Sequence, residues 1–452
     1  MFFLSRPTHR HLPKKHVAII KAIKRATIIV VFAAATSLSA QDIAPEESTS
    51  GEGENPSEST PIGQPIAPTN PDDGSVRLGL GGSVPTFNLG RRFGLSTSLT
   101  GGYDDNVNLT PTGSPSWFAN PNAVFTYQFG NPRLAMNLIA GAGITYYFDH
   151  PGGRDYDPNL YLRLSLAYKA SERLTFDVSV FAAYQAQPDV TSALSANRRL
   201  GNFFRSEDNI SAHYRWTPRF STVTSYTFSA LEYQNSTASS GDRLGNHLGE
   251  QVRYLLFPTT TATAGYAINI TDYQTTGRNL ITQTLTAGLD QTFGPHLTGI
   301  FQGGLQLHSG GQISPYIDAG LHYSFKSANV IWTNRYSIEE SGTGASSGRE
   351  TFRTNLALNY RVTARISANL AVSYQNGTGA QAAEIGFNGR VAGGAETLFD
   401  VSAEVRYAIT HSLAVNAGYR HTELDQGSTS AIASQGLGYT RNRYFAGLTY
   451  KF

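Results

Sequence analysis

Cysteine is absent from this chain of 452 residues, only 15% of the residues are charged, and the formal net charge is +2. The lack of cysteine excludes disulfides, thiolate metal sites and cysteine nucleophiles, and it is compatible with export. Lysine and arginine are scattered and nearly balanced by acids, so the basic patch of a nucleic-acid-binding protein is also missing. Soluble domains usually carry about 25% charged residues. This low charge, together with 45 glycines and 11% aromatics, favours an all-β chain.

Long apolar runs are missing too. The most apolar stretch, "ATIIVVFAAA", is too short to cross about 30 Å of hydrocarbon as a helix, which argues against the alternative of a membrane anchor. Basic residues precede the run and small residues follow it, which is the layout of a secretory signal. We therefore expect residues 1–40 to be a signal peptide cleaved near Ser39 or Ala40. The basic residues are Lys14, Lys15, Lys21, Lys24 and Arg25.

The predicted tail and linker span residues 41–92, of which residues 41–74 contain much Pro, Ser and Glu and almost no large apolar side chains. Such a segment cannot bury enough surface to offset its ordering entropy, so we expect a disordered periplasmic tail and linker. The part that includes "VRLGLGGSVPTFNLG" is ambiguous between a linker, a plug and an additional strand. The folded domain is expected over residues 93–452.

From about Phe93 onward the side chains alternate between apolar and polar with a period of two, which is typical of β-strands. In "LYLRLSLAY" the leucines and Tyr168 share one face, while Arg163 and Ser165 share the other. About eighteen such segments follow one another. They begin near Phe93, Asn122, Leu134, Leu160, Leu174, Asn209, Phe220, His247, Thr260, Thr282, Leu297, Tyr316, Val330, Phe352, Ile366, Leu398, Leu413 and Arg443.

The connections between these segments alternate between short turns, such as "KASER" and "WTPR", and longer polar loops, such as "HPGGRDYDPN". This alternation predicts a transmembrane antiparallel β-barrel of about 16 to 18 strands, with the short turns in the periplasm. A soluble sandwich would need several domains joined by linkers, and a propeller would show a blade repeat. Neither feature is visible. In the barrel the apolar parity faces lipid, because only a closed sheet satisfies its backbone in hydrocarbon.

The chain ends "RNRYFAGLTYKF", with apolar or aromatic residues on alternate positions and a terminal phenylalanine. This ending resembles the carboxy-terminal signal that the barrel-assembly machinery recognises in bacterial outer-membrane barrels. The resemblance implies a location in the outer membrane of a Gram-negative bacterium and that machinery as a partner during biogenesis. The residues that match are Tyr444, Leu448, Tyr450 and Phe452.

The end of the first strand, Tyr103-Asp104-Asp105-Asn106-Val107, resembles the putative β-barrel porin family associated with exopolysaccharide synthesis and export. The resemblance implies a channel or an export component. The acidic pair could ligate Ca²⁺, but the alternate-position acids of a calcium loop are missing. We therefore expect a solvated corner between strand and loop, and no metal.

Charged residues of both signs fall on the parity that would face the lumen. They either create a transverse field, with an arginine excess that suggests weak anion preference, or pair with one another to satisfy the interior. The sequence leaves both readings open. The candidate lumen-lining residues are Arg163, Asp177, Arg215, Arg253, Asp290, Asp318, Arg335, Glu339, Arg353, Arg361, Asp400, Glu404, Arg406 and Arg420.

These features predict a passive channel or the outer-membrane component of polysaccharide export, with small solutes or polysaccharide and membrane lipid as partners. The alternative is a structural or adhesive barrel with a closed lumen and partner-binding loops. No catalytic set is apparent, because Asp318 and His322 lie roughly 13 Å apart on one strand. We expect neither a cofactor nor enzymatic activity.

Overall fold

The computed structural model describes residues 90–187, 201–234, 242–274, 278–309, 311–339, 349–379, 396–426 and 438–452. The predicted signal peptide and nearly all of the predicted tail lie outside these ranges, while residues 90–92 belong to the first strand. No helix in the described part of the chain is long and apolar enough to cross a membrane.

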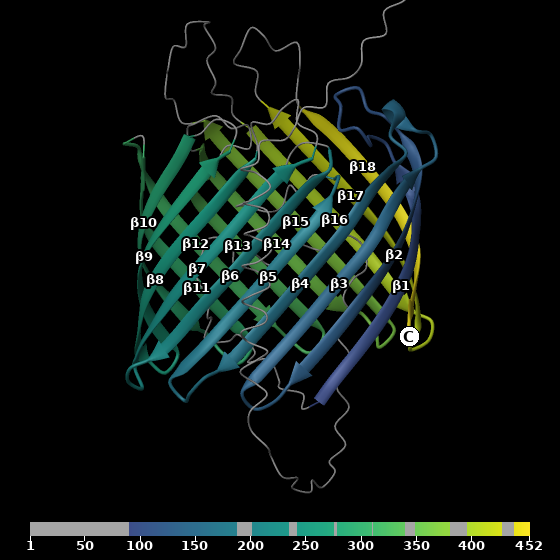
Figure 1. Ribbon diagram of the computed structural model, residues 1–452. Helices are drawn as coiled ribbons and strands as arrows, with labels where there is room; N and C mark the ends of the chain where they lie inside the picture. The colour runs from purple at the N-terminus through teal and green to yellow at the C-terminus, as the bar shows by residue number, and fades with distance from the viewer. Residues whose placement is uncertain are drawn as a thin grey trace, which may run out of the picture. The chain divides into compact units, whose positions relative to one another are not determined.

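The described chain forms one antiparallel sheet of 18 strands, each paired with its neighbours in sequence (Figure 1). A single turn of 3-10 helix, η1 (Pro151–Gly153), interrupts the loop between β3 and β4. The strands are β1 (Gly90–Asp104), β2 (Ser116–Gly130), β3 (Leu134–Tyr147), β4 (Tyr156–Lys169), β5 (Leu174–Gln185), β6 (Phe203–Arg215), β7 (Phe220–Tyr233), β8 (Arg243–Phe257), β9 (Thr260–Tyr273), β10 (Arg278–Thr292), β11 (Leu297–His308), β12 (Ile313–Ser324), β13 (Ala328–Glu339), β14 (Arg349–Arg361), β15 (Ile366–Gly379), β16 (Glu396–Ala408), β17 (Leu413–Gln426) and β18 (Tyr439–Lys451).

The sheet closes because β1 also pairs with β18, from Ser96 opposite Lys451 to Asp104 opposite Arg443. The backbone N–H of Phe452 extends this seam by donating to the carbonyl of Leu95 at 2.9 Å. The last strand therefore has a partner on both sides and leaves no open edge. The predicted 18-stranded antiparallel barrel is confirmed.

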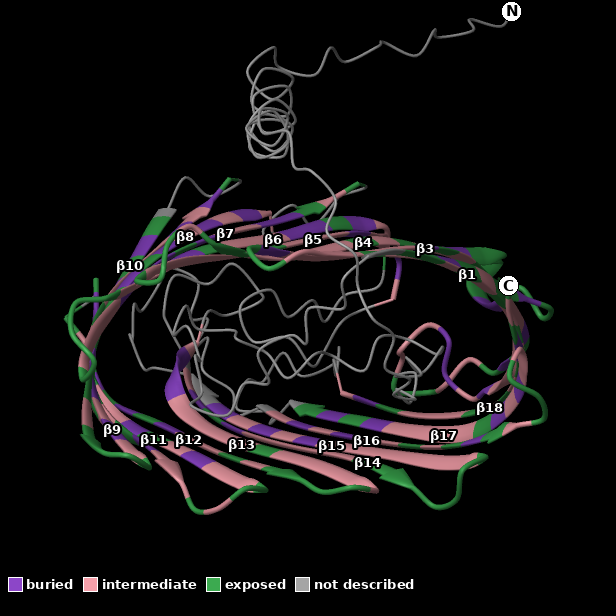
Figure 2. Ribbon diagram, turned by 90° about the horizontal axis from the view of Figure 1, so that it is seen from below, coloured by how far each residue is buried: buried purple, intermediate pink, exposed green. Residues whose placement is uncertain are grey.

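The two faces of the wall differ as the alternation predicts. Apolar side chains of one parity point outward and stay exposed, for example Leu99 at 56%, Leu248 at 51% and Leu448 at 51%. The opposite parity carries mostly hydroxyl, amide and charged groups that are buried inside the wall, such as Thr263 and Gln302. Seen along its axis, the barrel has an oval cross-section with two long sides (Figure 2). An exposed apolar exterior around a polar interior fits lipid outside and water inside.

Five of the eight short turns share one hydrogen-bond pattern. A Thr, Ser or Asn side chain at the start of the turn accepts the backbone N–H three residues later, at the first residue of the next strand. The oxygen is Asn131 Oδ1 for Leu134 (2.7 Å), Thr217 Oγ1 for Phe220 (3.0 Å) and Thr363 Oγ1 for Ile366 (3.0 Å). Each next strand therefore starts at a position that the local sequence fixes.

Aromatic rings gather at both ends of the outer surface. Tyr323 and Phe325 stack at the short-turn end, with ring centroids 6.4 Å apart, and Tyr103 packs edge-on against Trp117 at the other end, at 5.3 Å. Such rings occupy the two membrane interfaces. An even-numbered closed barrel with short turns at one end and aromatic girdles is the architecture of bacterial outer-membrane proteins. The chain is thus a barrel of the Gram-negative outer membrane, with its short turns in the periplasm.

Candidate functional site

Four ion pairs run between neighbouring or next-neighbouring strands on the inner wall. All eight partners belong to the set of candidate lumen residues. Because the carboxylates are almost fully buried, each pair neutralises a charge that the interior could not otherwise hold at low cost. For these eight residues the structure favours mutual pairing over an open transverse field. The pairs are Arg253–Asp290 (2.6 Å), Arg335–Asp318 (3.3 Å), Arg353–Glu339 (3.0 Å) and Arg420–Asp400 (2.9 Å).

The other six candidates also occupy the inward parity, but the structure does not gather them into one site. Arg163 on β4 lies over the ring of Phe181, with its guanidinium carbon 5.5 Å from the ring centroid. Two of the six lie at the periplasmic rim and are exposed, namely Arg215, which donates to the carbonyl of Glu172, and Arg361. The remaining three, Asp177, Glu404 and Arg406, lie on β5 and β16 toward the short-turn end.

The loop between β1 and β2, residues 105–115, folds into the barrel (Figure 2). Val107 is 0% exposed and packs against Phe118 and Tyr147, two rings on the inward parity of β2 and β3. Leu109, in the left-handed conformation with φ 52°, packs against a second apolar cluster on β16, β17 and β18. The members of that cluster are Leu398, Leu424 and Tyr439. This inward loop occupies part of the lumen near its extracellular end.

The motif Asp104-Asp105-Asn106 fastens the inward loop to β18 across the seam. The guanidinium of Arg441 donates to both carboxylate oxygens of Asp104, with Nε at 3.0 Å from each. Asp105 accepts the backbone N–H and the amide of Asn442, at 2.6 and 2.7 Å. Bidentate and charge-assisted contacts of this kind are the strongest hydrogen bonds in proteins.

Asn106 adds two further contacts. We call Asp104, Asp105, Asn106, Arg441 and Asn442 the seam lock. Its amide donates to the carbonyl of Thr440 at 2.9 Å and to that of Thr110 at 2.7 Å. Asp104 is 0% exposed, so the prediction of a solvated corner is wrong for this residue, whose strand end is covered by the loop. No cluster of potential metal ligands occurs among the described residues.

A buried polar network continues from the seam lock along the inner wall. Arg441 Nη1 donates to Gln187 Oε1 at 2.8 Å, and Gln187 Nε2 donates to the hydroxyl of Tyr147 at 2.9 Å. The Tyr147 hydroxyl donates in turn to Asp157 at 2.8 Å, and Asp157 also pairs with Arg154. These contacts join β18 to β3, to β4 and to Gln187, which follows β5. A network with each member satisfied rigidifies the wall that surrounds it.

Arg443 is the functional candidate that the sequence analysis missed. It lies on the inward parity of β18, half-buried, with its guanidinium carbon 4.0 Å from the centroid of the Phe118 ring. It forms no ion pair with a described residue. It lies between Arg420, opposite it on β17, and Asp104, opposite it on β1, and Asp104 pairs with Arg441. Arg441, Arg443 and Phe445 alternate on the inward parity of the last strand, and this pattern could have identified Arg443. The prediction considered only the outward residues of the same strand, which resemble the assembly signal.

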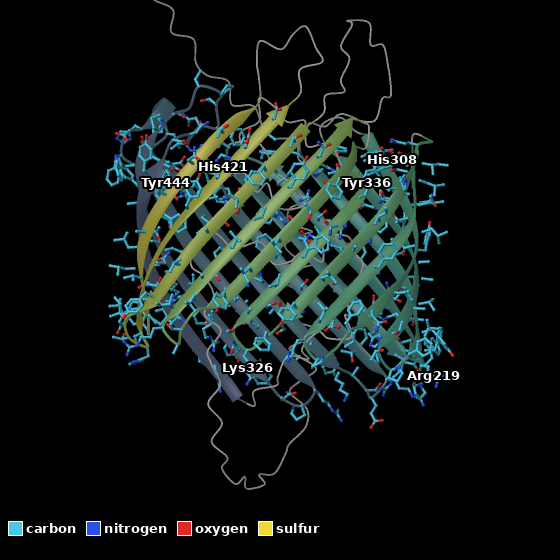
Figure 3. All side chains as sticks on the ribbon, turned by 180° about the vertical axis from the view of Figure 1, so that it is seen from behind. Arg219, His308, Lys326, Tyr336, His421 and Tyr444 are labelled. Atoms are coloured by element: carbon cyan, nitrogen blue, oxygen red, sulfur yellow. The ribbon has the colours of Figure 1, made fainter. Side chains whose placement is uncertain are left out.

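The four residues of the expected assembly signal all lie on the outward parity of the closing strand or directly after it. Tyr444 is visible on the outer surface beside His421, near the extracellular end (Figure 3). Phe452 is 74% exposed, and its ring meets that of Tyr450 edge-on at 4.9 Å. Leu448 and Tyr450 are exposed by 51% and 45%. Their role in recognition remains a prediction.

The comparisons with known proteins give low similarity throughout. No family model and no curated protein matches the chain. Among solved structures, the outer membrane protein OpdK from Pseudomonas aeruginosa is 10% identical, with a TM-score of 0.41 over 80% of this chain and 99% of OpdK. OccAB4 from Acinetobacter baumannii is 14% identical, with a TM-score of 0.39 over 80% and 98%. The siderophore receptor PirA from Pseudomonas aeruginosa is 10% identical, with a TM-score of 0.38 over 79% and 80%. These similarities are too low to assign the chain to a family.

Proposed function

We propose that the chain is a channel through which small polar solutes cross the outer membrane by passive diffusion. The observation that carries this proposal is the inner face of the wall, which presents mostly hydroxyls, amides and paired charges outside the two apolar clusters at its extracellular end. An interior that only had to be filled could be apolar, whereas a polar interior suits water and dissolved solutes. Barrels of 16–18 strands are generally wide enough for an aqueous channel.

Reconstitution of the refolded barrel in planar bilayers tests the proposal. We expect discrete conductance steps, because each inserted barrel adds one polar pathway. A protein that is folded, as shown by its altered mobility in unheated gels, yet electrically silent would contradict the proposal. That outcome would favour the alternative, a structural or adhesive barrel with a closed lumen.

Polysaccharide export is a second candidate, supported by a row of uncharged polar groups on β13, β14 and β15. Ser373 Oγ donates to Asn355 Oδ1 at 2.7 Å, and the Asn355 amide donates to Thr333 Oγ1 at 3.4 Å. Amide and hydroxyl groups can exchange hydrogen bonds with sugar hydroxyls, because both act as donors and acceptors. Neutral oligosaccharides that block ion current in a length-dependent manner would support this function, and the absence of any block would argue against it.

Arg443 is expected to give the channel a preference for anions. Its guanidinium forms no ion pair with a described residue, since Asp104, which lies opposite it on β1, pairs with Arg441. Arg420 and Arg441 add positive potential beside it, although each has an acid of its own. Replacing Arg443→Gln should move the reversal potential in a salt gradient toward the value of an unselective pore. Arg219→Gln removes the same charge at an exposed periplasmic turn (Figure 3) and should leave the reversal potential unchanged. Equal reversal potentials for Arg443→Gln and the wild type would contradict the assignment.

The inward loop should limit the conductance of the open barrel. Removing residues 108–113 and joining the ends with glycine removes Leu109 from the lumen and the contacts of Asn106 with Thr110, but keeps all five seam-lock residues and their contacts across the seam. We expect larger single-channel steps, because conductance rises with the cross-section of the narrowest aqueous segment. The measurement is single-channel recording of both proteins in the same salt. Steps of unchanged size would show that the loop does not line the narrowest part.

A further inference from the structure

Two carboxylates lie on the lipid-facing parity near the middle of their strands. Glu250 is on β8 between the exposed side chains of Leu248 and Val252, and Asp208 is on β6 beside the exposed Ile210. The other outward carboxylates of the described strands lie near a strand end, as Glu232 and Glu350 do. Asp208 and Glu250 therefore face the hydrocarbon layer rather than an interface.

Six uncharged polar side chains surround these carboxylates on the outer surface of β6 to β10. Because strand pairing places residues of one parity on one face, the whole set shares the outward surface. We call the set, together with the two acids, the polar stripe. Its uncharged members are Ser206, Thr224, Tyr226, Asn246, Tyr266 and Gln283.

The chain satisfies the two carboxylates only in part. Ser206 Oγ lies 3.3 Å from both oxygens of Asp208, and Thr224 Oγ1 donates to Glu250 at 2.5 Å. An ionised carboxylate can accept about four hydrogen bonds, so one hydroxyl leaves most of this capacity unfilled. In hydrocarbon, unlike in water, no solvent supplies the missing donors.

The same stripe carries donors with no acceptor of their own. The amide oxygens of Asn246 and Gln283 accept the hydroxyls of Tyr226 and Tyr266, at 2.7 and 3.0 Å. This leaves the N–H₂ groups of both amides facing outward, without a hydrogen bond to any described residue. The stripe thus combines unfilled acceptors and unused donors on one surface. A surface with both is complementary to itself, which is the property that an interface between identical chains requires.

We propose that the polar stripe is the contact surface between two copies of this barrel within the outer membrane. Each copy supplies amide donors to the carboxylates of the other, and lipid is excluded from both. The strands β6 to β8 lie on one long side of the oval (Figure 2), which gives neighbouring barrels a broad surface on which to meet. The donors that we assign to the carboxylates are the N–H₂ groups of Asn246 and Gln283 in the facing copy.

The absence of cysteine allows a direct test by site-specific cross-linking in native outer membranes. Leu248→Cys places one thiol within the polar stripe, and Leu99→Cys places one on β1, outside the stripe and at similar exposure, 51% against 56%. With a bismaleimide reagent we expect a cross-linked dimer from the Leu248→Cys protein and only a background amount from the Leu99→Cys protein. Equal yields from the two sites, or no dimer from Leu248→Cys, would overturn the proposal.

A second variant tests whether the carboxylates themselves hold the two copies together, rather than the two thiols merely meeting by chance in the membrane. Asp208→Val with Glu250→Leu, added to the Leu248→Cys protein, removes the groups that need donors and makes the surface resemble the rest of the exterior. The dimer should fall to the background yield, while unheated gels verify that the barrel is folded. Undiminished cross-linking in the folded variant would show that the acids do not hold the copies together.

Discussion

Replacing Asp104 by asparagine is expected to lower the free energy of unfolding by about 3–5 kcal/mol, the usual cost of removing one partner of a buried ion pair. Asp104 is 0% exposed and receives three hydrogen bonds from Arg441, so its loss leaves the Arg441 guanidinium charged and poorly compensated. The cost should be large because the pair also joins the first strand to the last.

Urea unfolding of the refolded barrel in detergent micelles, followed by tryptophan fluorescence, measures this effect. Glu423→Gln is a matched control, since the Glu423 side chain is 56% exposed and should change stability by less than about 0.5 kcal/mol. The double variant Asp104→Leu with Arg441→Met should recover much of the loss, because an apolar pair can replace a buried ion pair. If the single variant unfolds like the wild type, the seam lock does not stabilise the closed barrel.

Replacing Phe452 by alanine should strongly reduce the amount of barrel in the outer membrane and hardly change its stability. The Phe452 ring is 74% exposed and, among the aromatic residues that the structure describes, contacts only Tyr450, while the backbone N–H that donates to Leu95 is retained. The loss of stability should therefore stay below about 0.5 kcal/mol, as for other surface substitutions. The loss of assembly follows from the resemblance of the ending to the signal that the assembly machinery recognises.

Quantifying the folded protein in outer membranes, and separately unfolding the purified refolded protein, distinguishes the two effects. Phe325→Ala is the matched control, because Phe325 is an exposed aromatic at the same end of the barrel, with 49% exposure. It should assemble normally. Normal membrane levels of the Phe452→Ala protein would remove the basis for the assembly role.

The accuracy of the predicted strand starts depends on the side of the membrane. Strands that follow a periplasmic turn, such as β3, β5 and β7, begin where the sequence predicts, at Leu134, Leu174 and Phe220. Strands that enter from the extracellular side begin earlier, at Ser116 rather than Asn122 for β2. Above the lipid both faces of a strand can be polar, so the alternation that reveals the strand disappears while the backbone pairing continues.

For the candidate site, the sequence could predict only which side chains face the lumen. Alternation assigns Asp318 and Arg335 to the inner face, and their pairing follows once the register between β12 and β13 is known. Arg253 and Asp290 lie on β8 and β10, and they meet across the small threonines of β9. A single sequence contains no measure of register, so these partners could not be derived. The seam lock was hidden for the same reason, because it joins residues 337 positions apart.

The even number of strands has a practical consequence for detecting the protein on cells. Gly90 at the start of β1 pairs with Gly130 beside a periplasmic turn, and Leu413, which follows another, pairs with Tyr450 at the end of β18. An epitope tag fused behind Phe452 would therefore be hidden from antibodies on intact bacteria and accessible only after the envelope is opened. Surface labelling requires the tag to be inserted at the opposite rim, for example between η1 and β4.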